Sequence, residues 1–158
     1  MLKTVKRKSF RASDASFAIV ASEYNARYVD AMLRAARAEL KRAGARNVQI
    51  VRVPGAYEIP VVASRLASHA SRITHHAIIC LGVILRGETA HAVHIGEAVS
   101  HALMQIQLKY EIPVIHEVLL LDNEEQARVR CLGRKHNRGA EAAQTALAMA
   151  EVMAKLPA

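Results

Sequence analysis

Four short segments of the sequence concentrate aromatic, acidic, histidine and arginine side chains. In chain order they are Ser22-Glu23-Tyr24-Asn25, Pro54-Gly55-Ala56-Tyr57-Glu58, Arg86-Gly87-Glu88-Thr89-Ala90-His91, and a basic region with Arg130 and residues 133–139. Aromatic rings can hold a flat ligand, while arginines and the unpaired amides of a helix start can hold a phosphate. Histidine can carry a proton near neutral pH. These residue types favour a small-molecule site for a phosphate-bearing ligand, with His91 as the proton carrier.

Each of these residues also has a purely structural interpretation. Pro54-Gly55 alone is a turn, and Glu88 and Thr89 are equally consistent with caps at a helix start. His91 is one of eight histidines, and the basic residues 134–138 could form a solvated turn. The spacing of these residues alone therefore does not name a substrate.

Strands and helices alternate along the chain and must position these segments. Strands are predicted over 16–21, 48–53, 76–85 and 112–121. Helices are predicted over 28–43, 57–70 beyond Pro60, 95–109, from Asp122 or Asn123 to about Arg130, and after Gly139 to about Lys155. The run 76–85 shows no polar alternation, which is typical of a central parallel strand covered on both faces. Such alternation implies right-handed crossovers and a parallel sheet between helices. We therefore expect one α/β domain, with ligands bound at the carboxyl ends of its strands.

Composition and charge narrow the class of protein further. The chain has 158 residues, of which 52% are hydrophobic, enough for one domain with a real core. Its two cysteines argue against a disulfide framework, and neither a membrane span nor a signal peptide is evident. These features indicate a soluble, cytoplasmic protein.

Most of the net charge of +8 comes from the start of the chain. Residues 1–11 hold five basic side chains and no acidic one, so we expect 1–14 to be a basic arm and 15–158 to be the domain. The domain lacks the interleaved aromatics that stack on bases, and nucleic-acid binding is therefore not expected.

Three motifs resemble the lumazine synthase family of riboflavin biosynthesis. They are VPGAYEIP (53–60), LGVILRGETAH (81–91) and HNRGAEAAQTALAMA (136–150), within a similarity that runs from about Phe17 to Ala154. The resemblance implies a flavodoxin-like three-layer α/β/α sandwich with a four-stranded parallel sheet. It also implies a homo-oligomer, either a pentamer or an assembly of pentamers, and riboflavin synthase as a candidate partner.

The resemblance also implies a reaction between two small-molecule substrates. The family condenses 5-amino-6-(D-ribitylamino)uracil with 3,4-dihydroxy-2-butanone 4-phosphate. The products are 6,7-dimethyl-8-ribityllumazine, phosphate and water, and no metal or organic cofactor is implied. Nor does the resemblance imply a membrane or nucleic-acid partner.

Matched by motif, each residue of the candidate site receives a role from the resemblance. Residues matching the pyrimidine and ribityl site are Tyr24, Asn25, Ala56, Tyr57, Glu58, Val83, Ile84, Leu85 and His116; residues matching the phosphate site are Glu88, Thr89, Arg130 and Arg138. His91 matches the proton-transfer histidine. The family builds each pocket from two neighbouring chains, with His116 and the residues around Tyr24 on different ones.

The sequence departs from the family pattern at several of these positions. Ala92 and Val93 stand where an aromatic residue and an acid usually follow the histidine, and His116 replaces a frequent Phe. Leu120-Leu121 replaces a frequent Thr pair, and Arg138 replaces Lys. The alternative interpretation is a non-catalytic lumazine- or flavin-binding shell protein of the same fold.

Overall fold

A parallel four-stranded sheet forms the middle of the molecule. The computed structural model describes residues 11–68 and 74–157. Its strands are β1 (Ser16–Ser22), β2 (Asn47–Val53), β3 (Ala77–Leu85) and β4 (Val114–Leu121), in the order β2-β1-β3-β4. All three strand pairs are parallel. This is the order of the corresponding strands in flavodoxin-like folds, so the predicted fold class is confirmed.

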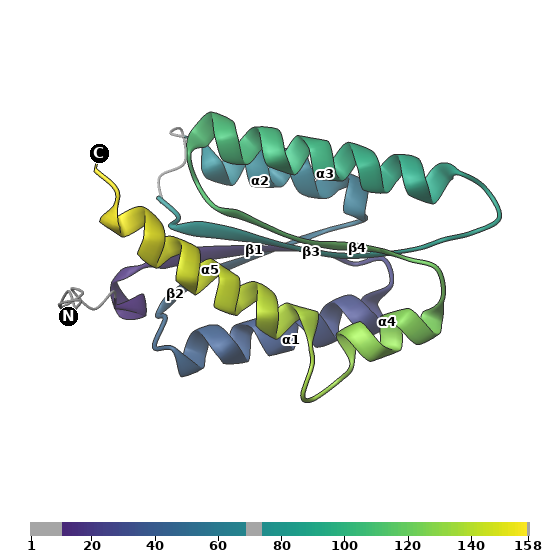
Figure 1. The fold of residues 1–158 in the computed structure, drawn as a ribbon, viewed down its shortest axis with the longest axis horizontal. Coiled ribbons are helices and arrows are strands. Elements are labelled where there is room, and N and C mark those ends of the chain that lie inside the picture. Colours follow the sequence, from purple (N-terminus) through teal and green to yellow (C-terminus); the bar gives the residue numbers. More distant parts are fainter. Residues whose placement is uncertain (1–10, 69–73, 158) are drawn as a thin grey trace, which may run out of the picture.

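Helices cover both faces of the sheet in three layers (Figure 1). One face carries α2 (Ile59–Ala67) and α3 (His91–Tyr110); the other carries α1 (Ala26–Arg42), α4 (Glu124–Cys131) and α5 (Arg138–Lys155). Short 3-10 helices occur at Ala12–Asp14 (η1) and Ala56–Glu58 (η2). The first ten residues of the expected basic arm lie outside the described residues. Within the described residues, no helix combines the length and apolarity needed to cross a bilayer.

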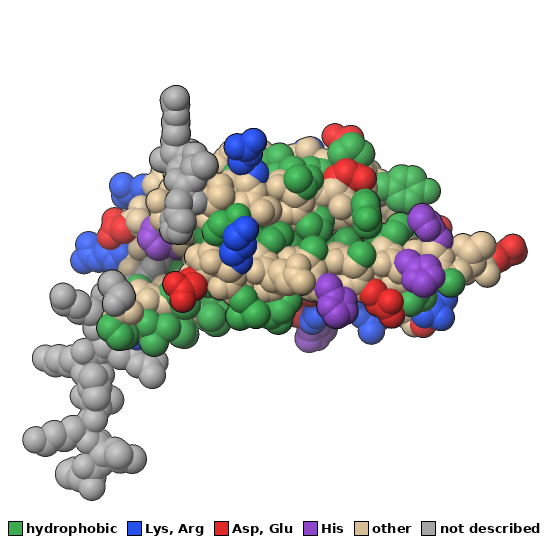
Figure 2. Space-filling view, turned by 90° about the horizontal axis from the view of Figure 1, so that it is seen from above, with side chains coloured by type: hydrophobic (Ala, Val, Ile, Leu, Met, Phe, Trp, Pro, Cys, Tyr) green, Lys and Arg blue, Asp and Glu red, His purple; other side chains and the backbone are tan. Residues whose placement is uncertain are grey.

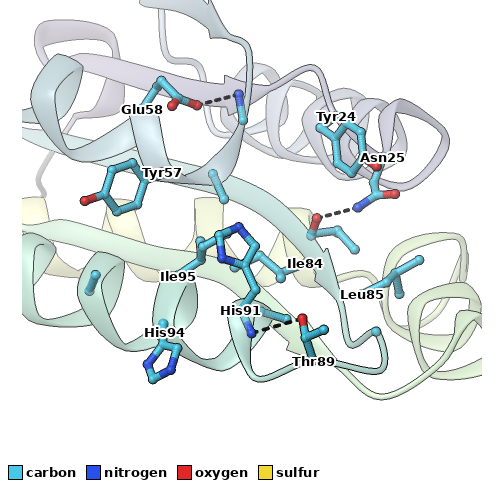
Figure 3. Close-up of a pocket in the computed structure, with 16 residues that line it drawn as sticks. Tyr24, Asn25, Tyr57, Glu58, Ile84, Leu85, Thr89, His91, His94 and Ile95 are labelled. Atoms are coloured by element: carbon cyan, nitrogen blue, oxygen red, sulfur yellow. Dashed lines mark hydrogen bonds between the residues drawn. The ribbon is translucent and has the colours of Figure 1, made fainter.

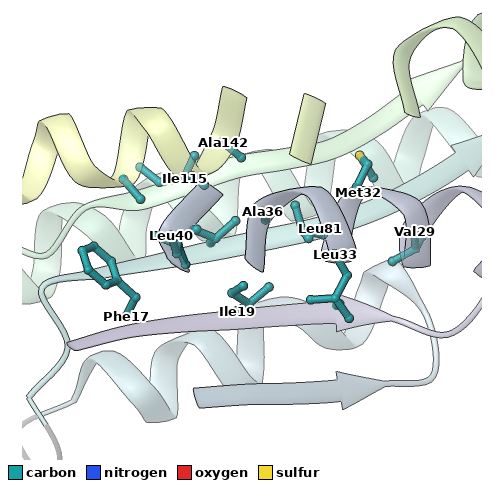
Figure 4. Packing of buried hydrophobic residues seen from close by; sticks show 14 of the residues in the cluster. Phe17, Ile19, Val29, Met32, Leu33, Ala36, Leu40, Leu81, Ile115 and Ala142 are labelled. Atoms are coloured by element: carbon teal, nitrogen blue, oxygen red, sulfur yellow. The ribbon is translucent and has the colours of Figure 1, made fainter. Parts of the chain in front are cut away.

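Strand alternation divides the buried side chains into two cores. On β1, Phe17 and Ile19 point into the core under α1 and α5 (Figure 4), whereas Ala18 and Val20 point toward α2 and α3. The run 77–84 of β3 is buried throughout because the strand contributes to both cores. The prediction of a covered central strand is confirmed.

The α1 and α5 backbones approach each other closely at Gly139. A Cβ atom at this position would overlap the backbone of Met32, so only glycine fits in the first turn of α5. The cap of α5 is Asn137, whose side chain accepts a hydrogen bond of 2.9 Å from the Gly139 N–H. The helix was predicted to follow Gly139, whereas α5 begins at Arg138 and includes Gly139 in its first turn.

Other element ends differ from the prediction for local reasons. The helix predicted beyond Pro60 begins one residue before this proline, at Ile59, directly after residues 56–58, which form the tighter η2 turn. The strand predicted from residue 112 begins at Val114, after Pro113, which has no N–H for a ladder bond. Asn123, rather than Asp122, caps α4 by accepting a hydrogen bond of 2.9 Å from the Gln126 N–H.

Candidate functional site

The main cavity lies beyond the carboxyl ends of β1 and β3. At this point the strand order switches, because β2 is added on one side of β1 and β3 on the other. Open α/β sheets bind ligands at this crevice. The cavity has a volume of about 980 Å³, the size of a small-molecule pocket. Its lining residues are Tyr24, Asn25, Gly55, Ala56, Tyr57, Glu58, Val83, Ile84, Leu85, Gly87, Thr89, His91, Ala92, His94, Ile95 and Ala98.

Asn25 ties the β1 loop to the end of β3. Its backbone is left-handed, with φ of 58°, a conformation that asparagine tolerates better than most residues. Its Nδ2 donates a hydrogen bond of 2.7 Å to the Val83 carbonyl oxygen. This bond holds the preceding residue, Tyr24, at the rim of the cavity, where its side chain is 74% exposed.

The second loop presents another aromatic ring across the cavity. The Tyr24 N–H donates to the Pro54 carbonyl oxygen at 2.9 Å and so joins the two loops. The Gly55 N–H donates to Glu58 Oε2 at 2.9 Å, which closes the η2 turn. Tyr57, between them, is 64% exposed (Figure 3). Two aromatic faces are therefore open to a flat ligand.

His91 is the first residue of α3, and its ring points into the cavity toward Ile84 and Tyr57 (Figure 3). Its backbone N–H donates to Thr89 Oγ1 at 3.4 Å. The Val93 and His94 N–H groups donate to the Ala90 carbonyl oxygen at 3.1 and 3.2 Å, so the amide of Ala92 is the first-turn amide left for a ligand among these residues. Gly87 and Thr89 line the cavity beside this helix terminus, a position that commonly binds anions. Among the described residues, no acidic side chain forms an ion pair with the His91 ring.

The α3 wall of the cavity is longer than the motifs indicated. His94, Ile95 and Ala98 also line it, because they share one helix face with His91 at spacings of three, four and seven residues. The helix was predicted to begin near Ile95, and α3 instead begins at His91. If the helix had been predicted from His91, its periodicity would have placed His94, Ile95 and Ala98 on the same face as His91.

Four of the expected site residues do not line this cavity. Glu88 is exposed in the loop between β3 and α3, although its neighbours Gly87 and Thr89 line the pocket. Arg130 is exposed on α4 and forms neither a hydrogen bond nor an ion pair with any described residue. Its guanidinium is therefore available to an anionic ligand.

Arg138 is already engaged with two carboxylates. Its Nη2 lies 3.0 Å from Glu117 Oε1, and its Nη1 lies 2.7 Å from Glu141 Oε2. The Glu117 side chain is only 8% exposed. Burial raises the pKa of Glu117, and the charge of Arg138 opposes that rise. Within this chain, Arg138 thus neutralises a buried acid on β4, a contact that the motif did not indicate.

His116 lies on the face of β4 that α3 covers. Its Nε2 lies 2.7 Å from Ser100 Oγ, and its Nδ1 accepts a hydrogen bond of 3.2 Å from the Val118 N–H. β4 is an edge strand, so the residue stands beside α3 at the open edge of the sheet, outside the cavity.

The cavity has the mixed lining that is typical of an organic ligand site. Its polar side-chain groups are two tyrosine hydroxyls, the Thr89 hydroxyl, the Asn25 amide, one carboxylate and two imidazoles, set among apolar strand and helix residues. Across the described residues, no group of three or more His, Cys, Asp or Glu side chains is arranged to hold a metal ion.

Comparison with known proteins shows the family of this chain. The family model described as 6,7-dimethyl-8-ribityllumazine synthase matches residues 14–154. The chain belongs to the 6,7-dimethyl-8-ribityllumazine synthase family. All three motifs, and every residue that lines the cavity, fall inside the matched range.

Curated lumazine synthases support the same membership over nearly the whole chain. A 6,7-dimethyl-8-ribityllumazine synthase of Stenotrophomonas maltophilia (strain R551-3) is 40% identical over 145 residues, covering 90% of this chain and 92% of that protein. Those of Xanthomonas euvesicatoria pv. vesicatoria (strain 85-10) and Xanthomonas oryzae pv. oryzae (strain PXO99A) are 39% and 40% identical over 149 residues. Each of these two alignments covers 93% of this chain and 95% of the relative.

Proposed function

We propose that this chain condenses 5-amino-6-(D-ribitylamino)uracil with 3,4-dihydroxy-2-butanone 4-phosphate, releasing 6,7-dimethyl-8-ribityllumazine, phosphate and water. The observation that carries the proposal is the cavity itself. It sets the His91 ring opposite two exposed tyrosines and beside the amides at the start of α3, in a chain of this family. The two tyrosines, the amides and the imidazole suit the pyrimidine, the phosphate and proton transfer, respectively.

The pyrimidine binds on the aromatic side of the cavity. Tyr24 stacks on the heterocycle, and Val83, Ile84 and Leu85 line its edge with apolar side chains and main-chain polar groups. The η2 turn of Ala56, Tyr57 and Glu58 holds the ribityl chain. Because Asn25 fixes the Tyr24 loop to β3, this half of the site is organised before ligand binds.

The phosphate of the second substrate binds at the start of α3 and is completed by Arg130. Glu88 and Thr89 form the turn whose backbone amides face the phosphate, and the helix dipole favours the negative charge. Arg130 provides the bidentate, permanently charged group that grips phosphate and stabilises it as it leaves. Arg138 provides long-range positive charge, since its guanidinium is shared with Glu117 and Glu141.

His91 moves the protons that the condensation requires. Imine formation, loss of phosphate and ring closure each need a proton to be removed or delivered, and an imidazole does both near neutral pH. Holding two reactive substrates in one cavity provides much of the remaining acceleration.

The working form is a homo-oligomer, and we favour a pentamer. Hydrophobic side chains are spread over the face that α2 and α3 cover (Figure 2). Among them are Val61, Met104 and Leu108, which are 69%, 54% and 70% exposed. A neighbouring chain packed on this face would cover them and would bring its own His116 and Arg130 to the cavity. The cytoplasm is the expected location, and riboflavin synthase, which would consume the product, is the expected partner.

Product formation tests the proposal. Purified protein is mixed with both substrates, and lumazine is followed by its absorbance against the uncatalysed reaction. Parallel samples omit one substrate at a time. We expect lumazine above the background only in the complete mixture; a rate equal to the background, with pyrimidine still bound, would instead identify a non-catalytic binding protein.

A further inference from the structure

His116 is held by a directed chain of three hydrogen bonds that links β4 to α3. The Val118 N–H donates to Nδ1 at 3.2 Å, so Nδ1 must be unprotonated. A neutral imidazole then carries its proton on Nε2, which lies 2.7 Å from Ser100 Oγ. The Ser100 hydroxyl in turn donates to the Gly96 carbonyl oxygen at 2.7 Å. Every donor in this series of three hydrogen bonds meets an acceptor only when the His116 ring is neutral.

This arrangement leaves neither ring nitrogen available for a ligand. Both ring nitrogens form hydrogen bonds within the protein, while the His116 residue as a whole remains exposed at the edge of the sheet. The part of the side chain open to a neighbour is therefore the flat, uncharged face of the ring. An aromatic face packs on a heterocycle in the same way as a Phe ring.

We propose that Ser100 is a positioning residue for substrate binding. The Val118 N–H sets the Nε2-protonated tautomer of His116, and Ser100 accepts from Nε2 and holds the ring so that it presents only its aromatic face to the pyrimidine of a neighbouring chain. The inference rests on the proposed function, in which His116 covers the heterocycle.

The electrostatic surroundings agree with a neutral ring. Burial lowers the pKa of His116 and outweighs a hydrogen bond to its own backbone, which opposes the shift; no described residue forms an ion pair with it. On α3, the titratable residues nearest in sequence to Ser100 are Glu97 and His101, which are both exposed. On β4, Glu117 occupies the opposite face and pairs with Arg138. No neighbouring carboxylate is therefore placed to favour the imidazolium.

The ring nitrogens provide a readout that is independent of activity. Solid-state nitrogen-15 NMR of histidine-labelled protein reports which nitrogen of each ring is protonated, and the signal lost in His116→Phe assigns this residue. In the wild type, we expect the Nε2-protonated form at pH 6 to 8. In Ser100→Ala, the Val118 N–H still selects the same tautomer, and we expect the Nε2 signal to shift because its hydrogen-bond acceptor is lost. An Nδ1-protonated ring in the wild type, or an unchanged Nε2 signal in Ser100→Ala, would overturn the proposal.

Kinetics with matched variants separate positioning from a general effect on the fold. Ser100→Ala should raise the KM for the pyrimidine about fivefold, the size of one net hydrogen bond, and affect kcat less. Ser100→Thr, which keeps the hydroxyl on the helix, should restore most of the affinity. Thr145→Ala removes a similar hydroxyl-to-carbonyl bond on α5 and should leave the KM unchanged.

A double variant completes the test. Ser100→Ala should have little effect in a His116→Phe background, where there is no imidazole to position. An equal effect in both backgrounds would show that Ser100 acts without His116 and would contradict the proposal. A wild-type protein that forms no lumazine would remove the proposed function, whereas the NMR result would still decide whether Ser100 holds the His116 ring by its Nε2.

Discussion

Asn25 Nδ2 donates a hydrogen bond of 2.7 Å to the Val83 carbonyl oxygen and joins the loop after β1 to the end of β3 at the cavity. The same residue makes the left-handed turn that starts α1. One residue therefore fixes both the backbone conformation of the Tyr24 loop and the distance of this loop from the apolar end of β3.

Asn25→Ala and Asn25→Gly separate these two contributions. Both variants lose the bond to Val83, so both should raise the KM for the pyrimidine. Only alanine also resists the positive φ, so Asn25→Ala should be less stable than Asn25→Gly by about 1 kcal/mol. Denaturant unfolding at equal protein concentration measures the difference; equal stability would mean that the turn relaxes without strain.

His91→Gln should lower kcat while the pyrimidine still binds. Acid–base groups typically contribute about 10²- to 10⁴-fold, and we expect the low end because positioning survives and water can substitute. Calorimetric titration with the pyrimidine gives the binding control. An unchanged kcat would exclude His91 from proton transfer.

Arg130→Ala should raise the KM for the butanone phosphate far more than the KM for the pyrimidine. Arg128→Ala is the matched control, because Arg128 lies on the same helix but pairs with Glu125 at 2.6 Å. The control should change neither KM. If Arg130→Ala raised both substrates' KM equally, the residue would not be specific for phosphate.

Arg138→Met should destabilise the protein because it leaves Glu117 buried without its cation. We expect a loss of about 2–3 kcal/mol at pH 7, less than for a fully buried pair because the Arg138 side chain is 44% exposed. Burial already raises the folded-state pKa of Glu117, and losing Arg138 raises it further. The unfolded-state pKa is the same in both proteins, so the deficit should grow as the pH rises above the folded-state pKa of Glu117 in the wild type, which burial sets above the ordinary value of about 4.3. It should level off above the still higher pKa of Glu117 in the variant.

Adding Glu117→Gln to Arg138→Met provides the control for this explanation. The double variant should recover most of the lost stability and lose the pH dependence, since no buried carboxylate remains. A deficit that is independent of pH and of Glu117 would attribute the effect to packing of the Arg138 side chain instead.

Gly139→Ala should destabilise the contact between α1 and α5, because its Cβ would overlap the Met32 backbone. Overpacking of this kind costs about 1–3 kcal/mol. Gly96→Ala is the comparison within a helix, because the nearest atom there is 3.5 Å from the new Cβ. That variant should gain up to about 1 kcal/mol from helix propensity. Thermal unfolding measures the difference. If the Tm values of both variants were higher than that of the wild type, or both lower, the explanation would be refuted.

Periodicity and alternation predicted the sheet, its central strand and the loops that line the cavity. Those signals are local, because they depend on which positions along one element are apolar. The helix over 95–109 was predicted from its apolar periodicity, and the first turn of α3 from His91 to His94 does not extend that pattern clearly. The His94 part of the cavity wall was therefore not predicted. The ion pair between Glu117 and Arg138 could not be predicted either, because it joins β4 to α5 across the intervening helix α4, and the path of that connection is not a local signal.

The central claim is that one chain provides the cavity and its neighbour completes it, and mixed oligomers test this most directly. His91→Gln and Arg130→Ala chains are refolded together in equal amounts and assayed for lumazine at a low concentration of butanone phosphate. If His91 and Arg130 of one site come from different chains, about a quarter of the sites regain both residues at random, and the mixture should exceed both parents. A rate no higher than the mean of the two parents would contradict the shared site.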